Sequence, residues 1–132
     1  MKKQSEIYPW ESVILAEDFY AMVEWYKNIL SFKSSLLVDD EYRYCSLKNK
    51  QGIEIGIADS KQMGIKNPNR KNNTVVLQFG VNSVKDFFIY LQKKGETITF
   101  GPSFDKSGKF WYGGFNDLEG NPIWVVETNC PK

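Results

Sequence analysis

The chain contains no histidine, and this absence removes several kinds of chemistry at once. Serine–histidine–aspartate hydrolysis, cysteine–histidine catalysis and every histidine-ligated metal site are excluded. A metal site would have to use oxygen ligands or cysteine, and oxygen ligands favour hard cations over zinc. There are only two cysteines, Cys45 and Cys130, which lie far apart and outside any paired-cysteine motif. We therefore expect two free thiols and a cytoplasmic location.

Long apolar runs and an excess of one charge are also missing. No stretch is long enough to span a bilayer, and residues 1–6 lack the apolar run of a signal peptide. The 17 Lys and Arg residues nearly balance the 16 Asp and Glu residues, and a net charge of +1 gives no reason to expect a nucleic acid or membrane partner. The 132 residues are 42 % apolar and 25 % charged, which is typical of a single globular domain with its own core.

The first half of the chain has the pattern of a strand, a helix and three strands. Residues 10–17 are rich in Val, Ile and Leu and predict a buried strand. Asp18 is a good N-cap for residues 19–30, whose apolar side chains follow helical spacing. The three further strands are expected at residues 34–38, 42–48 and 52–58.

The same order returns in the second half. Residues 74–81 predict a strand, and Ser83 caps a helix that runs to Lys94, with Gly95 at its C-terminal end. The last strands are expected at residues 97–100, 109–116 and 122–127, with a long polar connection over residues 101–108. Aligning the two helix caps gives an offset of 65 residues (83 minus 18), so the chain is an internal repeat of about half its length.

Residues 60–73 separate the two halves and show almost no apolar periodicity. We interpret them as a linker within a single domain, whose first module spans about residues 9–59 and whose second spans about 74–128. Lys66, Arg70 and Lys71 form a basic patch that we expect on a solvated surface, with a phosphate-binding patch as the alternative.

Two segments resemble a known group of proteins. Residues 25–32, Trp-Tyr-Lys-Asn-Ile-Leu-Ser-Phe, resemble the Phe-Tyr-x-x-x-Leu-Gly-Phe signature of the glyoxalase / bleomycin resistance / dioxygenase group, the vicinal oxygen chelate superfamily, with Ser31 in place of the usual glycine. Residues 114–127 resemble its closing hairpin, in which a turn leads into a strand that carries a metal-binding Glu. The resemblance implies an α+β, glyoxalase-like fold, in which two βαβββ modules form a curved mixed sheet around a cavity.

The resemblance also implies where a metal ion would be bound. Each module of the family supplies one ligand from its first strand and one from its last, and the matching positions here are Glu11, Glu54, Val76 and Trp124. Valine has no donor atom, and the indole N–H cannot bind a cation. Glu127 lies three residues after Trp124 and should point to the other face of its strand. We therefore predict no metal cofactor, with a weakly held divalent cation as the alternative.

Strand alternation and the resemblance together predict which side chains line the cavity. Glu11 and Glu54 are the candidate catalytic residues. The candidate ligand-binding residues are Trp124, Gln78, Val76, Trp111, Tyr44 and Gly56. The pattern does not decide whether Trp111, or Phe110 together with Tyr112, turns toward the cavity.

Several candidates also have a purely structural interpretation. Trp124 could instead be a core residue. Glu54 could be the ion-pair partner of a Lys or Arg, because a buried carboxylate needs a partner. Glu11 could be an exposed residue at the start of a strand. Asp117 and Glu119 lie in a turn and are interpreted as turn residues rather than catalytic ones.

An aromatic wall beside carboxylates suits a small aromatic or cationic organic molecule, through stacking and cation–π contacts. We therefore predict a small-molecule-binding protein of the bleomycin-resistance-like kind. The alternative is a lyase, isomerase or dioxygenase that uses Glu11 or Glu54 as a base or as part of a metal site, so the sequence leaves open whether the chain is an enzyme. The resemblance further implies a homodimer, in which the modules of two chains pair or exchange.

Overall fold

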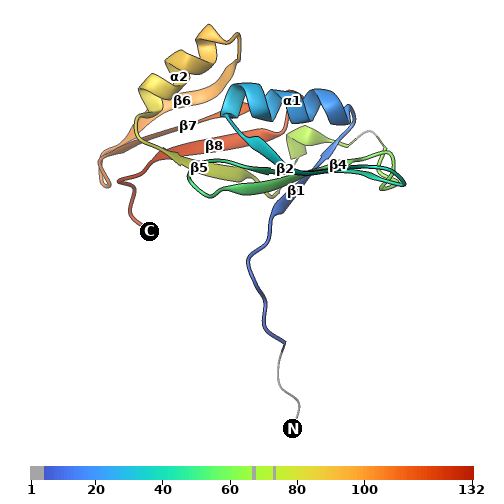
Figure 1. The fold of residues 1–132 in the computed structure, drawn as a ribbon. Coiled ribbons are helices and arrows are strands. Elements are labelled where there is room, and N and C mark those ends of the chain that lie inside the picture. The colour runs from blue at the N-terminus through green and yellow to red at the C-terminus, as the bar shows by residue number, and fades with distance from the viewer. Residues whose placement is uncertain (1–4, 67, 73) are drawn as a thin grey trace. The chain divides into compact units, whose positions relative to one another are not determined.

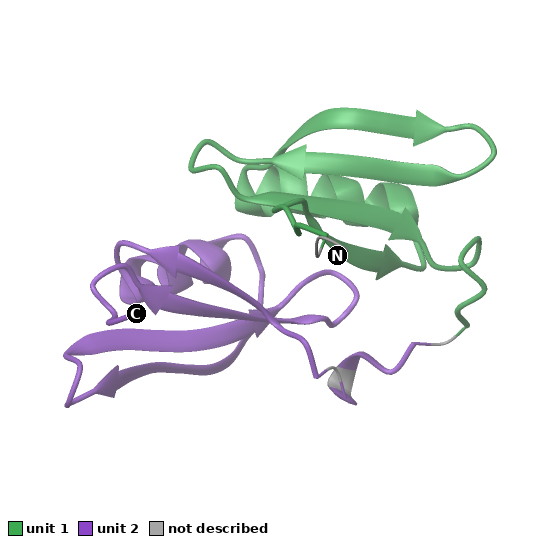
Figure 2. Ribbon diagram, turned by 90° about the horizontal axis from the view of Figure 1, so that it is seen from below, with its two compact units in different colours: residues 1–66 green, residues 67–132 purple. Residues whose placement is uncertain are grey.

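The computed structural model describes residues 5–66, 68–72 and 74–132. The chain divides into two compact units, Met1–Lys66 (unit 1) and Asn67–Lys132 (unit 2), and the boundary falls inside the expected linker (Figure 2). Within the described residues, each unit holds one α-helix and a four-stranded sheet, in the chain order strand, α-helix and three strands (Figure 1). The α+β class and the duplicated βαβββ order are confirmed, and the strands form two open sheets.

Unit 1 consists of a strand, a helix with the predicted N-cap, and three antiparallel strands. Its elements are β1 (Ser12–Ala16), α1 (Phe19–Leu30), β2 (Lys33–Asp39), β3 (Arg43–Lys48) and β4 (Glu54–Asp59). The sheet order is β1-β4-β3-β2, with β1 parallel to β4 and the other pairs antiparallel. The Asp18 side chain accepts a hydrogen bond from the Ala21 backbone N–H at 3.2 Å, which confirms the predicted N-cap.

One face of the unit 1 sheet packs on α1 and forms the core. Ile55 and Ile57 of β4 are fully buried on this face, as strand alternation predicts, and Met22 and Tyr26 are buried on the helix. β1 is less buried than predicted, because Val13 is 50 % exposed. Val13 pairs with Gly56 and so lies on the sheet face away from the helix.

Unit 2 repeats the arrangement. After a short 3-10 helix, η1 (Arg70–Asn72), its elements are β5 (Leu77–Val81), α2 (Val84–Lys93), β6 (Ile98–Asp105), β7 (Phe110–Asn116) and β8 (Pro122–Glu127). The sheet order is β5-β8-β7-β6, with β5 parallel to β8. The Ser83 hydroxyl accepts from the Asp86 backbone N–H at 3.1 Å, which confirms the second predicted N-cap. Phe115 and Ile123 are fully buried on the helix-facing side.

Two strand predictions in unit 2 were wrong in extent. β5 begins at Leu77 rather than at residue 74, and Val75 is 85 % exposed. The predicted polar connection over residues 101–108 is largely strand, because β6 continues to Asp105 and stays paired with β7 after register shifts. The pairing of Ser103 with Tyr112 resumes the ladder beyond the Gly-Pro step, which the sequence pattern had marked as a strand end.

The two helices end differently. In unit 1 the C-terminal residue Ser31 adopts a left-handed conformation with φ of 62°, at the position where the family signature has glycine. In unit 2 the C-cap residue, Lys94, has a φ of -83°, and the left-handed conformation is taken one residue later by Gly95, with φ of 84°. Neither helix in the described part of the chain has the length and apolar character of a membrane span. Cys45 is buried and Cys130 half-buried, and both are free thiols.

Candidate functional site

Each sheet has one face packed on its helix and one face turned away from it, here called the open face. On the open face of unit 1, the carboxylate of Glu11 is held by two hydroxyl groups. Tyr44 donates a hydrogen bond to Glu11 Oε1, and Ser46 donates to the same oxygen at 2.9 Å. Tyr44 and Ser46 lie two residues apart on β3, so both side chains point to one side of the sheet. Glu11 is therefore half-buried and oriented, rather than a free side chain at a strand start.

Gly56 provides the space that this arrangement needs. A Cβ atom at Gly56 would overlap the ring end of Tyr44 and lie 3.1 Å from Glu11 Oε1. The space above Gly56, which we predicted to leave room for a ligand, is occupied by the Tyr44 phenol. Burial, followed by the hydrogen bond to Glu11, raises the pKa of Tyr44 above its ordinary value. The phenol thus stays protonated and remains a donor at neutral pH.

Glu54 lies on the same open face but has a different environment. Its Oε1 is 3.0 Å from the Lys48 ammonium, and its side chain is 42 % exposed, so the paired interpretation of Glu54 holds. Glu11 and Glu54 both border a hollow of about 280 Å³, which also includes Trp10 and Leu36. The structure thus brings the two candidate carboxylates to one depression, with an apolar rim beside them.

On the open face of unit 2 the prominent group is aromatic. Trp124 of β8 is 44 % exposed, and its ring meets the Phe100 ring edge-on at a centroid distance of 6.2 Å and an angle of 87°. Gly114 pairs directly with Trp124, and a Cβ atom at Gly114 would overlap the Phe100 ring. Trp124 is therefore not a core residue, and Phe100 is a neighbour that the sequence reasoning missed. Gln78, the register partner of Trp124 on β5, is exposed on the same face.

Trp111 lies on the opposite face, which resolves the question left open for β7. The Lys85 ammonium of α2 lies 3.9 Å from the centroid of the Trp111 ring, and Gly113 faces Phe88 of the same helix. Tyr112 consequently turns to the open face, so Trp111 and Trp124 do not form one aromatic wall. Val76 precedes β5 and is half-buried.

Glu127 is committed to the helix side of unit 2. Its Oε2 accepts from the Val84 backbone N–H at 3.1 Å, at the start of α2, and its Oε1 accepts from the Trp111 backbone N–H at 3.0 Å. The two oxygens thus join the end of β8 to α2 and to β7. This agrees with the prediction that Glu127 points away from the face of Trp124.

The donor set at the four family positions does not fit a divalent cation. Glu11 and Glu54 belong to unit 1, where hydroxyl groups and an ammonium already bind their Oε1 atoms. Val76 and Trp124 of unit 2 offer no ligand atom. Across residues 5–66, 68–72 and 74–132, no group of three or more His, Cys, Asp or Glu side chains could hold a metal ion.

Arg70 is placed differently from the solvated patch predicted for it. Its guanidinium donates to Glu119 Oε1 at 2.7 Å and to Asn121 Oδ1 at 3.0 Å, and its side chain is only 11 % exposed. Asp117 accepts from the Asn121 backbone and amide groups, so Asp117 and Glu119 are turn residues as interpreted from the sequence. Lys66 is exposed, and the Lys71 side chain falls outside the described residues. The predicted basic patch is therefore wrong for Arg70.

No protein-family model matches the chain, and no curated protein matches it. Solved structures do. The chain is similar to a glyoxylase/bleomycin resistance protein/dioxygenase domain from Frankia sp. EAN1pec, with 18 % identity, a TM-score of 0.71 and 93 % of each chain covered. It is similar to a lactoylglutathione lyase from Agrobacterium tumefaciens, with 14 % identity, a TM-score of 0.69 and 97 % of each chain covered.

A third similar structure is an integron cassette protein from the mobile metagenome of V. cholerae, with 20 % identity, a TM-score of 0.65, and coverage of 96 % of this chain and 99 % of that one. All three similarities extend over nearly the whole of both chains, so they concern both units. The chain therefore has the fold of the glyoxalase/bleomycin resistance protein/dioxygenase superfamily, the vicinal oxygen chelate fold.

Proposed function

We propose that this chain binds a small planar aromatic or cationic organic molecule and that it does so without a metal ion. The observation that carries the proposal is the exposed Trp124, which stands on the open face of β8 with Phe100 edge-on beside it. A solvent-accessible indole face braced by a second ring is a suitable surface for stacking on a flat ligand. The rigid neighbour also lowers the entropy that the indole would lose on binding.

The side chains on the open face of unit 1 favour a positively charged ligand. Glu11 is fixed by Tyr44 and Ser46 and borders a hollow of about 280 Å³. A preoriented carboxylate attracts an organic cation without first having to be ordered. Trp10, which lines the same hollow and is 84 % exposed, adds an aromatic face that favours cations.

Fluorine NMR of protein labelled with 5-fluorotryptophan tests the aromatic part of the proposal, because each of the four tryptophans gives its own resonance. A panel of aromatic amines and quaternary ammonium compounds is titrated, and the resonance lost in Trp124→Phe is assigned to Trp124. We expect that resonance to shift and Trp124→Ala to weaken binding about tenfold. Trp111→Phe, on the helix side, is the matched control. Equal affinity in Trp124→Ala and the parent protein would place the ligand elsewhere.

The metal-free part of the proposal has its own test. Purified protein is measured by elemental analysis and by thermal unfolding with Mn²⁺, Mg²⁺, Ni²⁺ or a chelator. We expect no stoichiometric metal and no metal-dependent change of the melting temperature. A bound ion at one equivalent, or a large stabilisation by one cation, would support the alternative of a divalent cation held by Glu11 and Glu54.

A lyase or isomerase is the second candidate, and the orientation of Glu11 favours it. A base held by neighbouring hydroxyl groups beside a hollow has the geometry expected of proton abstraction. One of the similar structures is a lactoylglutathione lyase. For any substrate found, Glu11→Gln should abolish turnover but retain binding, whereas Glu54→Gln should change turnover little. Retained turnover in Glu11→Gln would leave the binding protein as the better description.

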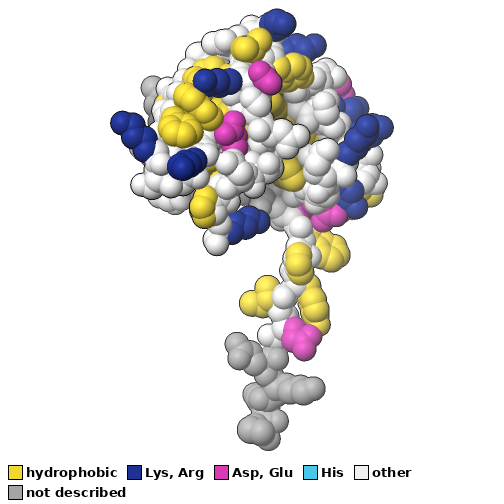
Figure 3. Space-filling model, turned by 90° about the vertical axis from the view of Figure 1, so that its left-hand side faces the viewer, with side chains coloured by type: hydrophobic (Ala, Val, Ile, Leu, Met, Phe, Trp, Pro, Cys, Tyr) yellow, Lys and Arg dark blue, Asp and Glu magenta, His cyan; other side chains and the backbone are white. Residues whose placement is uncertain are grey.

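We also propose that the chain forms a homodimer. The segment before β1 carries exposed hydrophobic side chains, Ile7, Tyr8 and Trp10, which are 96, 70 and 84 % exposed (Figure 3). Exposed apolar groups in such number are typical of surfaces that are covered by a partner. Size-exclusion chromatography with light scattering tests this, and a monomer at micromolar concentration would contradict it. Ile7→Ser combined with Tyr8→Ser, which leaves Trp10 beside the hollow, should shift the equilibrium toward monomer.

A further inference from the structure

A second hollow in unit 1 has a composition unlike that of the hollow beside Glu11. It measures about 790 Å³ and lies where the end of α1, the start of β2 and the turn after β3 meet. Its lining includes Lys33, Lys48 and Lys50, together with Asn49 and Gln51, and Leu30 is its one apolar member. Within the described chain, no carboxylate belongs to this lining. A cavity with ammonium, amide and hydroxyl groups, but without an acid, favours a negatively charged occupant.

The arrangement of the lysines costs stability in the absence of such an occupant. Lys33 of β2 and Lys48 of β3 are direct cross-strand partners, and like charges directly opposite each other in an antiparallel pair repel. Lys48 also pairs with Glu54 on its other side at 3.0 Å, so that one carboxylate relieves part of the repulsion. Lys33 and Lys50 add two further positive charges to the lining.

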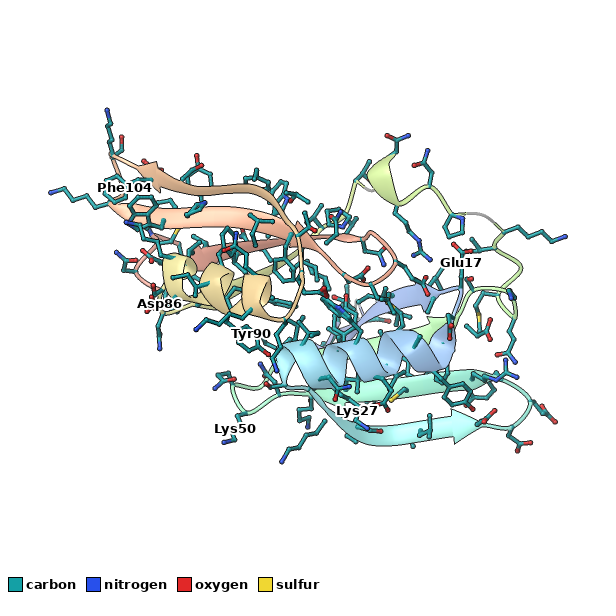
Figure 4. The ribbon with its side chains drawn as sticks, turned by 90° about the horizontal axis from the view of Figure 1, so that it is seen from above. Glu17, Lys27, Lys50, Asp86, Tyr90 and Phe104 are labelled. Atoms are coloured by element: carbon teal, nitrogen blue, oxygen red, sulfur yellow. The ribbon has the colours of Figure 1, made fainter. Side chains whose placement is uncertain are left out.

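The third lysine is carried by a well-closed turn. The Asn49 backbone N–H donates to Ile53 O at 3.1 Å, the Gly52 N–H donates to Asn49 O at 3.2 Å, and the Ile53 N–H donates to Asn49 Oδ1 at 2.8 Å. These three hydrogen bonds fix the loop between β3 and β4, on which Figure 4 shows Lys50. The backbone under Lys50 and Gln51 is therefore ordered before any ligand arrives.

We propose that this hollow is a binding site for a small soluble oxyanion that carries two or more negative charges, such as a phosphate or pyrophosphate group. Lys33 and Lys50 supply the main attraction, Lys48 shares its charge between the anion and Glu54, and the amide groups of Asn49 and Gln51 add neutral donors. The lining shares Ser35 and Lys48 with the hollow beside Glu11, whereas Lys33 and Lys50 line this hollow and not the other, so substitutions of these two lysines test this assignment separately from the proposed function.

The test is a titration of ¹⁵N-labelled protein with inorganic pyrophosphate, compared with NaCl at equal ionic strength. We expect saturable shifts confined to residues 31–35 and 48–51, which NaCl does not produce. Lys50→Glu should weaken binding about tenfold, because one favourable charge becomes an unfavourable one. The matched control is Lys27→Glu, at a half-buried lysine of α1 that lies outside the lining and pairs with Glu24; it should change the affinity less than about twofold.

Lys33→Glu separates a binding role from a structural one. The substitution turns the repulsive Lys33–Lys48 pair into an attractive one, so the melting temperature should rise by about 2 °C while pyrophosphate affinity falls about tenfold. A more stable protein that has lost the site supports the proposal. Shifts that do not saturate, that spread over lysines outside the hollow, or that weaken equally in Lys27→Glu would overturn it.

Discussion

In unit 1 the ring of Tyr44 occupies the space above Gly56, and in unit 2 the ring of Phe100 occupies the space above Gly114. The tyrosine ends in a hydroxyl that binds Glu11, whereas the phenylalanine places its edge against Trp124. The same device, an aromatic ring over a strand glycine, thus supports a carboxylate in one unit and an indole in the other. The repeated backbone leaves the chemistry of the open face to one or two side chains.

The units also differ in how an arginine is used. Arg70 of unit 2 is nearly buried between Glu119 and Asn121, whereas Arg43 of unit 1 is 41 % exposed while it contacts the buried Asp59 at 2.8 Å. Arg70→Met should therefore lower the free energy of unfolding by about 3 kcal/mol, because it leaves a poorly hydrated Glu119 without its cation. Arg43→Met should cost only about 1 kcal/mol, because the Lys61 backbone N–H still donates to Asp59 Oδ1 at 3.0 Å and because the Arg43 side chain itself is 41 % exposed. Urea unfolding measures both values.

A larger loss of unfolding free energy in Arg43→Met than in Arg70→Met would contradict this prediction.

The pH dependence of stability gives a second test of the Arg43–Asp59 pair. Burial alone would raise the pKa of Asp59, but the hydrogen bond from Arg43 and those from the backbone hold it below its ordinary value. A lowered pKa in the folded state stabilises the protein above about pH 4 and ceases to do so as the pH falls further. Arg43→Met should therefore reduce the loss of stability that occurs as the pH falls below about 4, whereas Arg70→Met should leave it unchanged.

Substitution of the two glycines that lie under aromatic rings, Gly56 and Gly114, should give the next largest loss of stability. Gly56→Ala and Gly114→Ala each place a methyl group in space filled by an aromatic ring, so each should destabilise the protein by about 2 kcal/mol. The two variants should differ in what they disturb. Gly114→Ala displaces Phe100 and should shift the fluorotryptophan resonance of Trp124, whereas Gly56→Ala should leave that resonance in place. Identical changes of the fluorotryptophan spectrum in both variants would mean that the Tyr44 and Phe100 rings do not act independently.

Tyr44→Phe removes the hydroxyl from the ring over Gly56, so that this ring becomes a phenylalanine ring like that of Phe100 over Gly114. Near neutral pH it should cost about 1 kcal/mol, because Glu11 loses one of its two hydroxyl donors and keeps Ser46. Because the pKa of Tyr44 is raised in the folded state, its contribution is complete below about pH 10 and is lost as the pH rises further. The variant should therefore lose less stability than the parent between about pH 10 and pH 12. Parallel alkaline profiles would contradict the raised pKa of Tyr44, which burial and the hydrogen bond to Glu11 cause.

The smallest expected effect concerns the helix ends. Ser31 and Gly95 both adopt a left-handed conformation after their helices, but only glycine does so without steric cost. Ser31→Gly should stabilise the protein by about 0.5–1 kcal/mol, and Gly95→Ala should destabilise it by about 1 kcal/mol. Thermal and urea unfolding measure both changes. A destabilised Ser31→Gly would show that the serine side chain contributes more than its backbone strain removes.

Much of the fold follows from short-range rules, and these predictions were confirmed. The bounds of α1 and β8 match because Asp18 caps a helix of regular apolar spacing and because Pro122 opens a strand after a turn. The facing of Glu54 and Trp124 follows from alternation along β4 and β8, where buried Ile55 and Ile123 mark the helix side.

What could not be predicted depends on partners far apart in sequence or on positions without side chains. The sequence around Arg70 gives no sign of Glu119 and Asn121, which lie in a turn near the other end of unit 2. The facing of Trp111 is ambiguous because Gly113 and Gly114 interrupt the alternation of β7. Ser46, by contrast, could have been found, since it follows Tyr44 by two residues on a predicted strand.

The strand order of each sheet also determines how the chain can fold as it is synthesised. Among the described residues, the first strand of each unit pairs with the last strand and with no other, β1 with β4 and β5 with β8. During translation the β2–β3 and β6–β7 hairpins are complete first, while β1 and β5 still lack a partner. Neither nascent sheet can close before its fourth strand has left the ribosome. Ribosome-bound chains that end before Asp59 should therefore expose the apolar edge of β1 to chaperones.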